Sequence, residues 1–400
     1  MLNIFHRHRK HITKIENLGL VGLVLTIGVA SVDSVWAIYL FSFLQSEAKV
    51  GFLAGIFTAV SFFISLALVP FIERMDESRM YKWIIFINGF LYLAFAINRS
   101  FIIMIILAIT NVIIITTRIT TFGIITRNES RIKDISKDEG MIYTLLNIGW
   151  LIGPLIGGFA ADKFSINFVF LLAFIFMMMS FLMSLRIRLK RSRIAEKNHK
   201  HLLRNFIQYF KKWNRISAYI FACGVAFWWG FIFIFMPLEI IKSGLSLSYV
   251  GIFLFFITFP VIFLEYHAGK IADKQGCKKF FVRGFLLLSL ISGCLFFVNN
   301  IFIIAVSLIF ASFVLAYIEP LQESYFFKCI KKKDEERYYP IFITNKAIAQ
   351  TVSRILIASV LLVFSFNYIF ITVSLVMLAM FFAALHIKDP IAKHIGMKVK

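Results

Sequence analysis

Long runs of apolar residues, separated by short charged segments, dominate this sequence. Each run approaches or exceeds the roughly 20 residues that a helix needs to cross the hydrocarbon core of a bilayer. Of the 400 residues, 60% are hydrophobic and only 16% are charged, whereas soluble domains carry about 25% charged residues. A transmembrane β-barrel would instead show short alternating segments. We therefore expect an all-α polytopic membrane protein with twelve transmembrane helices, over residues 18–43, 50–72, 82–98, 101–126, 141–161, 166–187, 216–238, 247–268, 281–298, 301–327, 340–363 and 367–386.

The basic residues predict the orientation of these helices. The formal net charge is +22. If the chain crosses the membrane twelve times, nearly all basic residues in the loops lie on the same side of the membrane as the two termini. Only four fall on the opposite side: Lys49, Arg99, Lys163 and Lys242. Since Lys and Arg accumulate in cytoplasmic loops, both termini are expected in the cytosol. The excess charge then faces anionic lipid, and nucleic acid is not an expected partner.

The sequence repeats itself at a spacing of 200 residues. FSINFVF at 164–170 returns as FSFNYIF at 364–370, and Val50-Gly51 returns as Val250-Gly251. A triplet at Gly28 recurs at Gly224, 196 residues later. Two parallel six-helix halves are a transporter architecture, with a substrate site near the midplane between them. We expect an N-terminal bundle at 1–187, a cytosolic basic linker at 188–215 and a C-terminal bundle at 216–400.

The later part of this linker, residues 201–216, has Leu203, Phe206, Ile207 and Phe210 on one helical face. Such a helix can lie flat on the inner leaflet. A solvated basic loop is the alternative.

A glycine-containing charged motif follows the eighth run. It resembles the G-x-L-A-D-R-x-G-R-R signature of the major facilitator superfamily, and its matching residues are Gly269, Asp273, Lys274, Gly276, Lys278 and Lys279. Glycine permits a tight turn, and the resemblance implies a gate that holds one conformation. The equivalent segment 200 residues earlier keeps Glu73 and Arg74 but lacks both glycines, which Val69 and Asp76 replace.

The fifth run contains a second motif of this superfamily. It resembles G-x-x-x-G-P-x-x-G-G, most familiar in exporters, through Gly149, Gly153, Pro154, Gly157 and Gly158. Glycines spaced by four form a smooth stripe that lets another helix approach closely, and proline removes a backbone hydrogen bond. A plain packing interface and a conformational hinge are both consistent with this pattern.

Ionisable side chains inside the spans are the candidates for function, because each costs about 2.5–3.5 kcal/mol to insert. The resemblance implies that helices one, four, seven and ten line a central cavity. Four of these side chains would then be cavity residues: Asp33, Arg118, Glu319 and Glu323. Lys346 and Arg354 fall in the eleventh run, where packing or gate pairing is expected.

Depth along the helices suggests which of these residues pair. Arg118 and Glu319 each lie about 12 Å from the cytosolic ends of their spans, which favours an interdomain pair. Asp33 lies about 15 Å from the opposite face, so direct contact with Arg118 is not expected. Burial favours a neutral carboxyl group and a nearby cation favours a charged one. A carboxylate that alternates between these environments can carry a proton; Asp33 is the first candidate and Glu319 the second, with a structural charge as the alternative for each.

These features predict a secondary transporter, not an enzyme, in a bacterial cytoplasmic membrane. The expected activity is proton-coupled efflux of small molecules by alternating access. Proton-coupled uptake of a sugar, peptide or organic anion is the alternative. We expect a monomer whose partners are a small-molecule substrate, protons or sodium ions, and the lipid bilayer. No cofactor and no metal site are expected.

Overall fold

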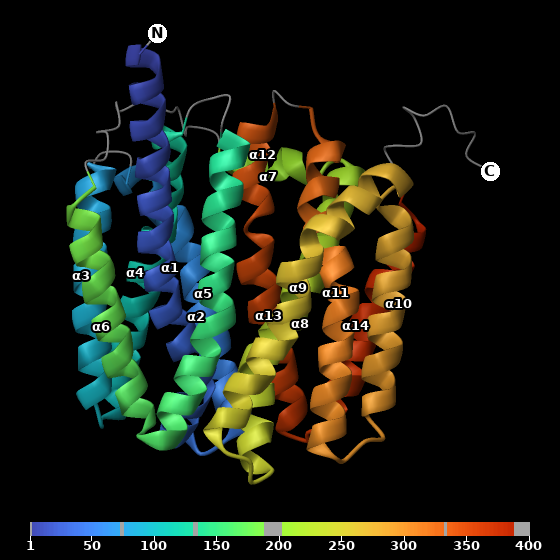
Figure 1. Cartoon of the computed structure of the whole chain (residues 1–400). Coiled ribbons are helices and arrows are strands. Elements are labelled where there is room, and N and C mark those ends of the chain that lie inside the picture. Colours follow the sequence, from blue (N-terminus) through green and yellow to red (C-terminus); the bar gives the residue numbers. More distant parts are fainter. Residues whose placement is uncertain (1, 73–75, 131–134, 188–201, 332–333, 388–400) are drawn as a thin grey trace, which may run out of the picture. The chain divides into compact units, whose positions relative to one another are not determined.

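The computed structural model describes residues 2–72, 76–130, 135–187, 202–331 and 334–387. Its described residues form fourteen helices and no strand (Figure 1). Two helices, α7 (Leu202–Tyr209) and α12 (Glu335–Phe342), have eight residues each. The other twelve are α1 (Leu2–Leu44), α2 (Glu47–Ile72), α3 (Glu77–Ile97), α4 (Phe101–Glu129), α5 (Ile135–Lys163), α6 (Ile166–Leu185), α8 (Trp213–Lys242), α9 (Leu247–Gln275), α10 (Lys278–Leu295), α11 (Ile301–Cys329), α13 (Asn345–Leu361) and α14 (Tyr368–Leu385).

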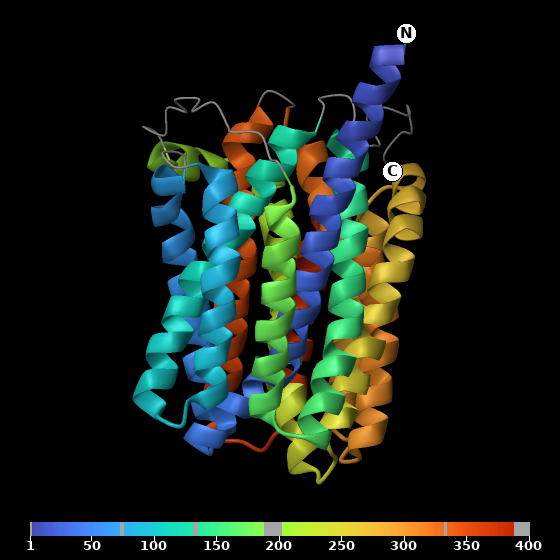
Figure 2. The ribbon, with the colours of Figure 1, turned by 60° about the vertical axis from the view of Figure 1, so that its left-hand side comes forward.

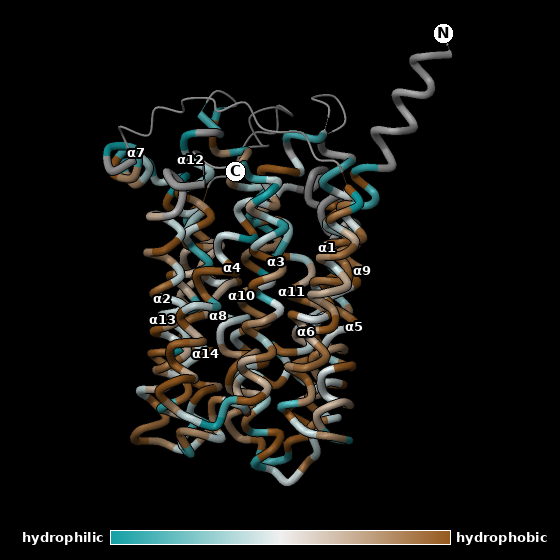
Figure 3. The backbone as a smooth tube through the Cα atoms, turned by 90° about the vertical axis from the view of Figure 1, so that its left-hand side faces the viewer, coloured by the Kyte–Doolittle hydropathy of each residue, from teal (hydrophilic) through white to brown (hydrophobic). Residues whose placement is uncertain are grey.

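Ten of these helices are long and apolar enough to cross a membrane. The two remaining long helices are marginal for identifiable reasons. The 18 residues of α10 include Lys278, Lys279 and Arg283, and α13 has only 17 residues, among them Lys346 and Arg354. Apolar residues predominate along the long helices (Figure 3). The predicted fold class, an all-α polytopic membrane protein, is confirmed.

The predicted eleventh span is wrong at its start. Residues 340–363 do not form one helix, because α12 ends at Phe342 and α13 begins at Asn345. Two side chains donate hydrogen bonds to backbone carbonyls at this break. Thr344 Oγ1 donates to the Ile341 carbonyl at 2.6 Å, and Asn345 Nδ2 donates to the Phe342 carbonyl at 2.5 Å. Such local hydrogen bonds compete with helix continuation.

The chain divides into two compact units that each combine separate segments. The first unit comprises Met1–Phe43, Val60–Glu196 and Leu245–Phe255, and the second comprises Leu44–Ala59, Lys197–Gly244 and Phe256–Lys400. The first part of α2 therefore belongs to the second unit, and the first part of α9 belongs to the first unit. The domain boundaries expected from the repeat stay a prediction.

Within the first unit, α3 packs most extensively against α6 and also contacts α4 (Figure 2). Within the second unit, the corresponding helices pair in the same way, since α10 packs against α14 and α11. The helix α8 forms the core of the second unit, and its Trp228, Phe231 and Phe235 are fully buried. The pairing pattern agrees with the repeat seen in the sequence.

One hydrogen bond shows the repeat at atomic detail. In the first unit, Ser31 Oγ of α1 donates to the Gly153 carbonyl of α5 at 2.9 Å. In the second unit, Ser353 Oγ of α13 donates to the Phe227 carbonyl of α8 at 2.8 Å. The offsets of 196 and 200 relate Ser31 to Phe227 and Gly153 to Ser353. The same helix pair is therefore joined in both units, with donor and acceptor exchanged.

The short helix α7 docks onto α12 in the second unit. Arg337 Nε of α12 donates to Asn205 Oδ1 at 2.6 Å, and the same guanidinium donates to Gln208 Oε1. Tyr209 is fully buried, and burial raises the pKa of its phenol. Ile207 is 58% exposed. One side of α7 therefore faces protein, and the other presents an apolar side chain to its surroundings.

Candidate functional site

A buried cation and two amides form a polar network in the first unit. Arg118 lies on α4 with only 5% of its surface exposed, and its Nη1 donates to Asn88 Oδ1 of α3 at 2.7 Å. Asn88 is fully buried, and its Nδ2 donates to Asn111 Oδ1 of α4 at 3.1 Å. The amide of Asn88 thus links the guanidinium to a second amide one to two turns away on the helix that carries it.

Asp33 belongs to the surroundings of this cation. It is half-buried on α1, and it lies within electrostatic range of Arg118, as do the buried phenols of Tyr81 and Tyr92. The expectation that Asp33 does not contact Arg118 directly stays a prediction. The acid and the cation come from two different helices of the first unit, α1 and α4.

The two acidic residues of α11 lie in the second unit and meet different partners. Glu319 is half-buried, and its Oε2 accepts a hydrogen bond from Trp229 Nε1 of α8 at 3.0 Å. Glu323 is exposed and its Oε1 accepts from the Tyr339 hydroxyl of α12 at 2.5 Å. Because Arg118 and Glu319 belong to different units, their pairing stays a prediction.

The first part of α2 is held in the second unit by charged groups. Arg354 Nη1 of α13 donates to the Ala54 carbonyl at 3.3 Å and to Thr58 Oγ1. At the start of α2, Glu47 Oε1 forms an ion pair with Lys242 Nζ of α8 at 2.8 Å. These contacts of Arg354 are consistent with either of the roles expected for it, packing or gate pairing, whereas Lys346 is exposed.

The glycine stripe of α5 lies against α1 in the first unit. A Cβ at Gly149 would lie 2.8 Å from Thr26 Cβ, and a Cβ at Gly153 would lie 2.5 Å from Ala30 Cβ. At Gly157, a Cβ would collide with the Ser31 carbonyl. The close approach of these two helices depends on the missing side chains.

The end of the motif faces α9 instead. A Cβ at Gly158 would lie 2.8 Å from Gly251 Cα, and a Cβ at Gly251 would lie 2.5 Å from the Pro154 carbonyl. Beside this contact, Ser248 Oγ donates to Asp162 Oδ2 at 2.5 Å. The motif thus packs on two helices of the first unit.

The charged motif between α9 and α10 is described in part. Gly276 has φ +87° and lies between the two helices, a conformation that glycine adopts without steric cost. Lys278 Nζ donates to the Leu385 carbonyl at the end of α14 at 2.8 Å, and Lys279 is exposed. Residues 73–75, and with them Glu73 and Arg74, lie outside the described residues, as do the side chains of Asp273 and Lys274; Gly269 lies within α9.

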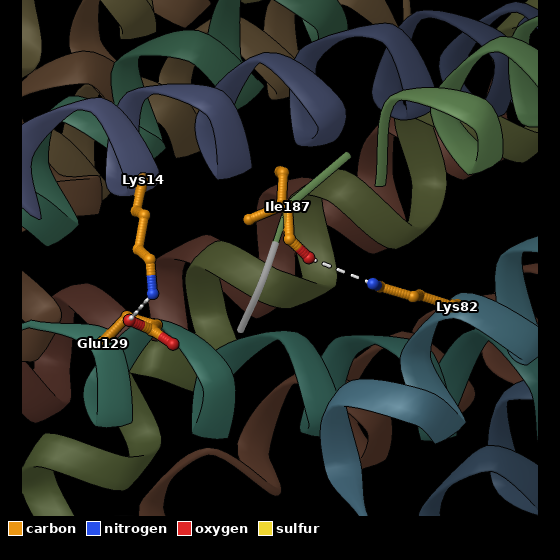
Figure 4. Close-up of polar contacts among 4 residues, drawn as sticks. All are labelled: Lys14, Lys82, Glu129 and Ile187. Atoms are coloured by element: carbon orange, nitrogen blue, oxygen red, sulfur yellow. Dashed lines mark hydrogen bonds and ion pairs between the residues drawn. The ribbon is translucent and has the colours of Figure 1, made fainter. Parts of the chain in front are cut away.

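Two contacts tie together helix ends of the first unit (Figure 4). Lys14 Nζ of α1 lies 3.7 Å from Glu129 Oε2 of α4. Lys82 Nζ of α3 donates to the Ile187 carbonyl, just beyond α6, at 3.0 Å. These contacts connect four helices at the end of the bundle that carries the basic loops.

Sequence reasoning missed the neutral partners of the charged residues. Asn88 accepts a hydrogen bond from Arg118, Asn111 accepts one from Asn88, and Trp229 donates one to Glu319. The signal for the two amides was present, because an asparagine inside an apolar span must find a hydrogen-bond partner. Trp229 gave no comparable signal among so many aromatic residues.

Comparison with known proteins identifies the family. Residues 18–321 and 218–396 match the sequence model of the Major Facilitator Superfamily. The two matched segments begin 200 residues apart, the spacing of the internal repeat. Comparison with curated protein sequences finds no match.

Solved structures share the fold at low sequence identity. A POT family transporter in complex with 5-aminolevulinic acid superposes with a TM-score of 0.77 at 11% identity, covering 93% of this chain and 95% of that chain. A mutant of the nucleoside transporter NupG superposes with a TM-score of 0.77 at 11% identity, covering 93% of this chain and 99% of that chain. The human organic anion transporter MFSD10 superposes with a TM-score of 0.68 at 13% identity, covering 94% of this chain and 99% of that chain.

The family match covers most of the chain, and the structural similarity extends over the whole fold. The chain belongs to the Major Facilitator Superfamily, and it is therefore a multi-pass membrane transporter and not an enzyme.

Proposed function

We propose that this transporter exports amphipathic small molecules across a bacterial cytoplasmic membrane in exchange for protons, as a monomer with both termini in the cytosol. The observation that carries the proposal is the placement of Asp33 within electrostatic range of the buried Arg118. The exporter-type glycine motif of α5 supports the direction. The asymmetry of basic residues supports the orientation.

Asp33 carries the proton in this proposal. A carboxylate beside a guanidinium favours its charged form, and a carboxyl group moved into an apolar environment favours its neutral form. Asn88 holds the guanidinium in place through its 2.7 Å hydrogen bond. A conformational change that separates Asp33 from Arg118 then drives proton uptake, and the reverse change drives release. Glu319, held by Trp229, is the second candidate for this role.

Uptake of a nutrient by proton symport is the second candidate function. Two cations, Arg118 and Arg354, suit an anionic substrate in either direction. Proteins with the same fold include transporters of peptides, nucleosides and organic anions. Sodium ions are the alternative coupling ion.

The proposal is tested with purified protein in liposomes under an imposed pH gradient. Ethidium serves as the amphipathic probe, and radiolabelled dialanine and uridine serve as nutrient probes. We expect gradient-driven ethidium export and its loss in Asp33→Asn. Glu16→Gln is the matched control, because Glu16 is an exposed acid on the same helix. Coupled transport that persists in Asp33→Asn removes Asp33 as the carrier, and net accumulation of dialanine or uridine supports symport instead.

A further inference from the structure

An open groove of about 330 Å³ runs between α10 and α11 in the second unit. From α10 its walls are Phe280, Arg283, Gly284 and Leu287. From α11 they are Phe313, Val314 and Tyr317. Almost all of the lining is apolar, and the rings of Phe280 and Tyr317 lie nearly parallel at 6.3 Å.

Gly284 lines the groove without a side chain. Gly284 packs so closely on α11 that a Cβ there would lie 2.9 Å from Ile318 Cγ2. Around the groove, Leu287 is 46% exposed and Phe313 is 42% exposed, and Leu290 and Phe310 nearby are more exposed still. In a membrane protein such an apolar outer surface contacts acyl chains rather than water.

The groove has a cationic end. Arg283 and Lys279 are both exposed and stand four residues apart on α10, so they share one helix face. Arg283 lies about 7.5 Å along the helix from Lys278, where α10 begins. This depth corresponds to the boundary between headgroups and acyl chains. Within the described part of the chain, neither cation has a hydrogen bond or an ion pair.

The acidic residues on the facing helix are engaged elsewhere. Glu319 accepts a hydrogen bond from Trp229, and Glu323 accepts one from Tyr339. The charge at the end of the groove is therefore positive.

The first half of the chain lacks both features at the equivalent positions. An offset of 200 relates Gly284 to Ile84 and Arg283 to Trp83. Ile84 is buried in α3 and Trp83 is 56% exposed. The glycine and the cation are thus particular to the second half and do not follow from the repeat.

We propose that this groove binds an anionic phospholipid. One acyl chain lies between Phe280, Leu287 and Phe313, and the headgroup phosphate lies against Arg283 and Lys279. Charge complementarity selects an anionic headgroup over a zwitterionic one, and basic groups at a membrane surface attract such lipids. The groove is a lipid site distinct from the polar network of Arg118.

The test measures lipid binding to the delipidated full-length protein by native mass spectrometry. The probes are phosphatidylglycerol and phosphatidylcholine with identical acyl chains, and glycerol 3-phosphate as the headgroup alone. We expect phosphatidylglycerol to bind at least five-fold tighter than phosphatidylcholine. Arg283→Gln should weaken phosphatidylglycerol about five-fold, the equivalent of about 1 kcal/mol for one charge near the surface.

Groove-filling variants test the acyl-chain contact separately. Leu287→Trp and Val314→Trp enter the groove from opposite helices, and either should reduce binding of both phospholipids. Arg79→Gln is the matched control, because Arg79 is an exposed cation at the position equivalent to Lys279 in the first half; its binding should be unchanged. Variants are compared after size-exclusion chromatography has established that they fold.

Three outcomes overturn the proposal. The first is phosphatidylglycerol binding within two-fold of the native value in Arg283→Gln and in whichever groove-filling variant folds. The second is equal affinity for the two phospholipids. The third is equally tight binding of glycerol 3-phosphate, which identifies a site for a free anion.

Discussion

At the scale of single residues, the main feature is that a buried cation is held by neutral groups. Arg118 donates to the amide of Asn88, which itself donates to the amide of Asn111. A hydrogen bond to a charged group contributes about 1.5–3 kcal/mol, and an unmatched buried charge costs more. The amide of Asn88 therefore positions the cation.

Asn88→Leu should destabilise the protein by about 1.5–3 kcal/mol, because Arg118 loses the acceptor of a charged hydrogen bond. Asn111→Ala should cost less, since Asn111 is half-buried and contacts the amide rather than the guanidinium. Thermal unfolding in detergent, followed by far-ultraviolet circular dichroism, measures both. Equal losses in the two variants would contradict the central position of Asn88.

The sequence identified these charged residues but not their partners. An ionisable side chain in an apolar run is conspicuous, and depth follows from the helical rise, so Asp33, Arg118 and Glu319 could be singled out. Depth does not give the direction in which a side chain points or the tilt of its helix. For that reason, the amide of Asn88, which accepts a hydrogen bond from Arg118, was overlooked.

At the scale of helices, close packing depends on where glycine stands. The glycine stripe of α5 lets the backbones of α5 and α1 lie close together, and Ser31 of α1 can therefore donate a hydrogen bond to the Gly153 carbonyl of α5. A stripe of glycines was predictable from its spacing of four, but the helices it meets were not. The break between α12 and α13 was also missed, because residues 340–343 directly before it are apolar and only Thr344 and Asn345 mark the boundary.

Gly153→Ala should destabilise the protein by about 1–3 kcal/mol, the usual cost of overpacking, because the new Cβ meets Ala30 Cβ at 2.5 Å and the Ile27 carbonyl at 2.9 Å. Gly123→Ala is the control. Gly123 lies inside α4, and a Cβ there has nothing within 4 Å, so alanine should be neutral or stabilising by up to about 1 kcal/mol. The thermal unfolding midpoints of the two variants are compared with that of the native protein. Similar midpoints for both variants would refute the packing role of Gly153.

At the scale of the whole molecule, each compact unit contains the first part of one helix from the other half of the repeat. Gly51 of α2 contacts Ala358 of α13 in the second unit, and Gly251 of α9 contacts Gly158 of α5 in the first. An offset of 200 relates both residues of one contact to both residues of the other. The repeat and the number of long helices were predictable because they depend on sequence patterns that extend over many residues. The placement of the first parts of α2 and α9 was not predictable, because it depends on tertiary packing.

If alternating access operates as proposed, both contacts must open during each cycle. Cysteines at Gly51 and Ala358 should cross-link on oxidation once the two helices separate slightly, because their Cβ atoms would start 2.9 Å apart and a disulfide needs about 3.5–4.5 Å; transport in liposomes should then stop. The four native cysteines, Cys223, Cys277, Cys294 and Cys329, are first replaced by serine. Reductant should restore activity, and a cross-linked protein with full activity would exclude this motion.

The hydroxyl that joins α1 to α5 sits on α1, whereas the equivalent hydroxyl in the second unit sits on α13, the counterpart of α5. Letter-by-letter alignment of the halves scores these positions as mismatches: serine against phenylalanine, and glycine against serine. The two halves therefore keep the hydrogen bond between the same pair of helices, although the donor and the acceptor have changed places. Ancestry in such duplicated chains is therefore better measured by matching contacts than by matching residues.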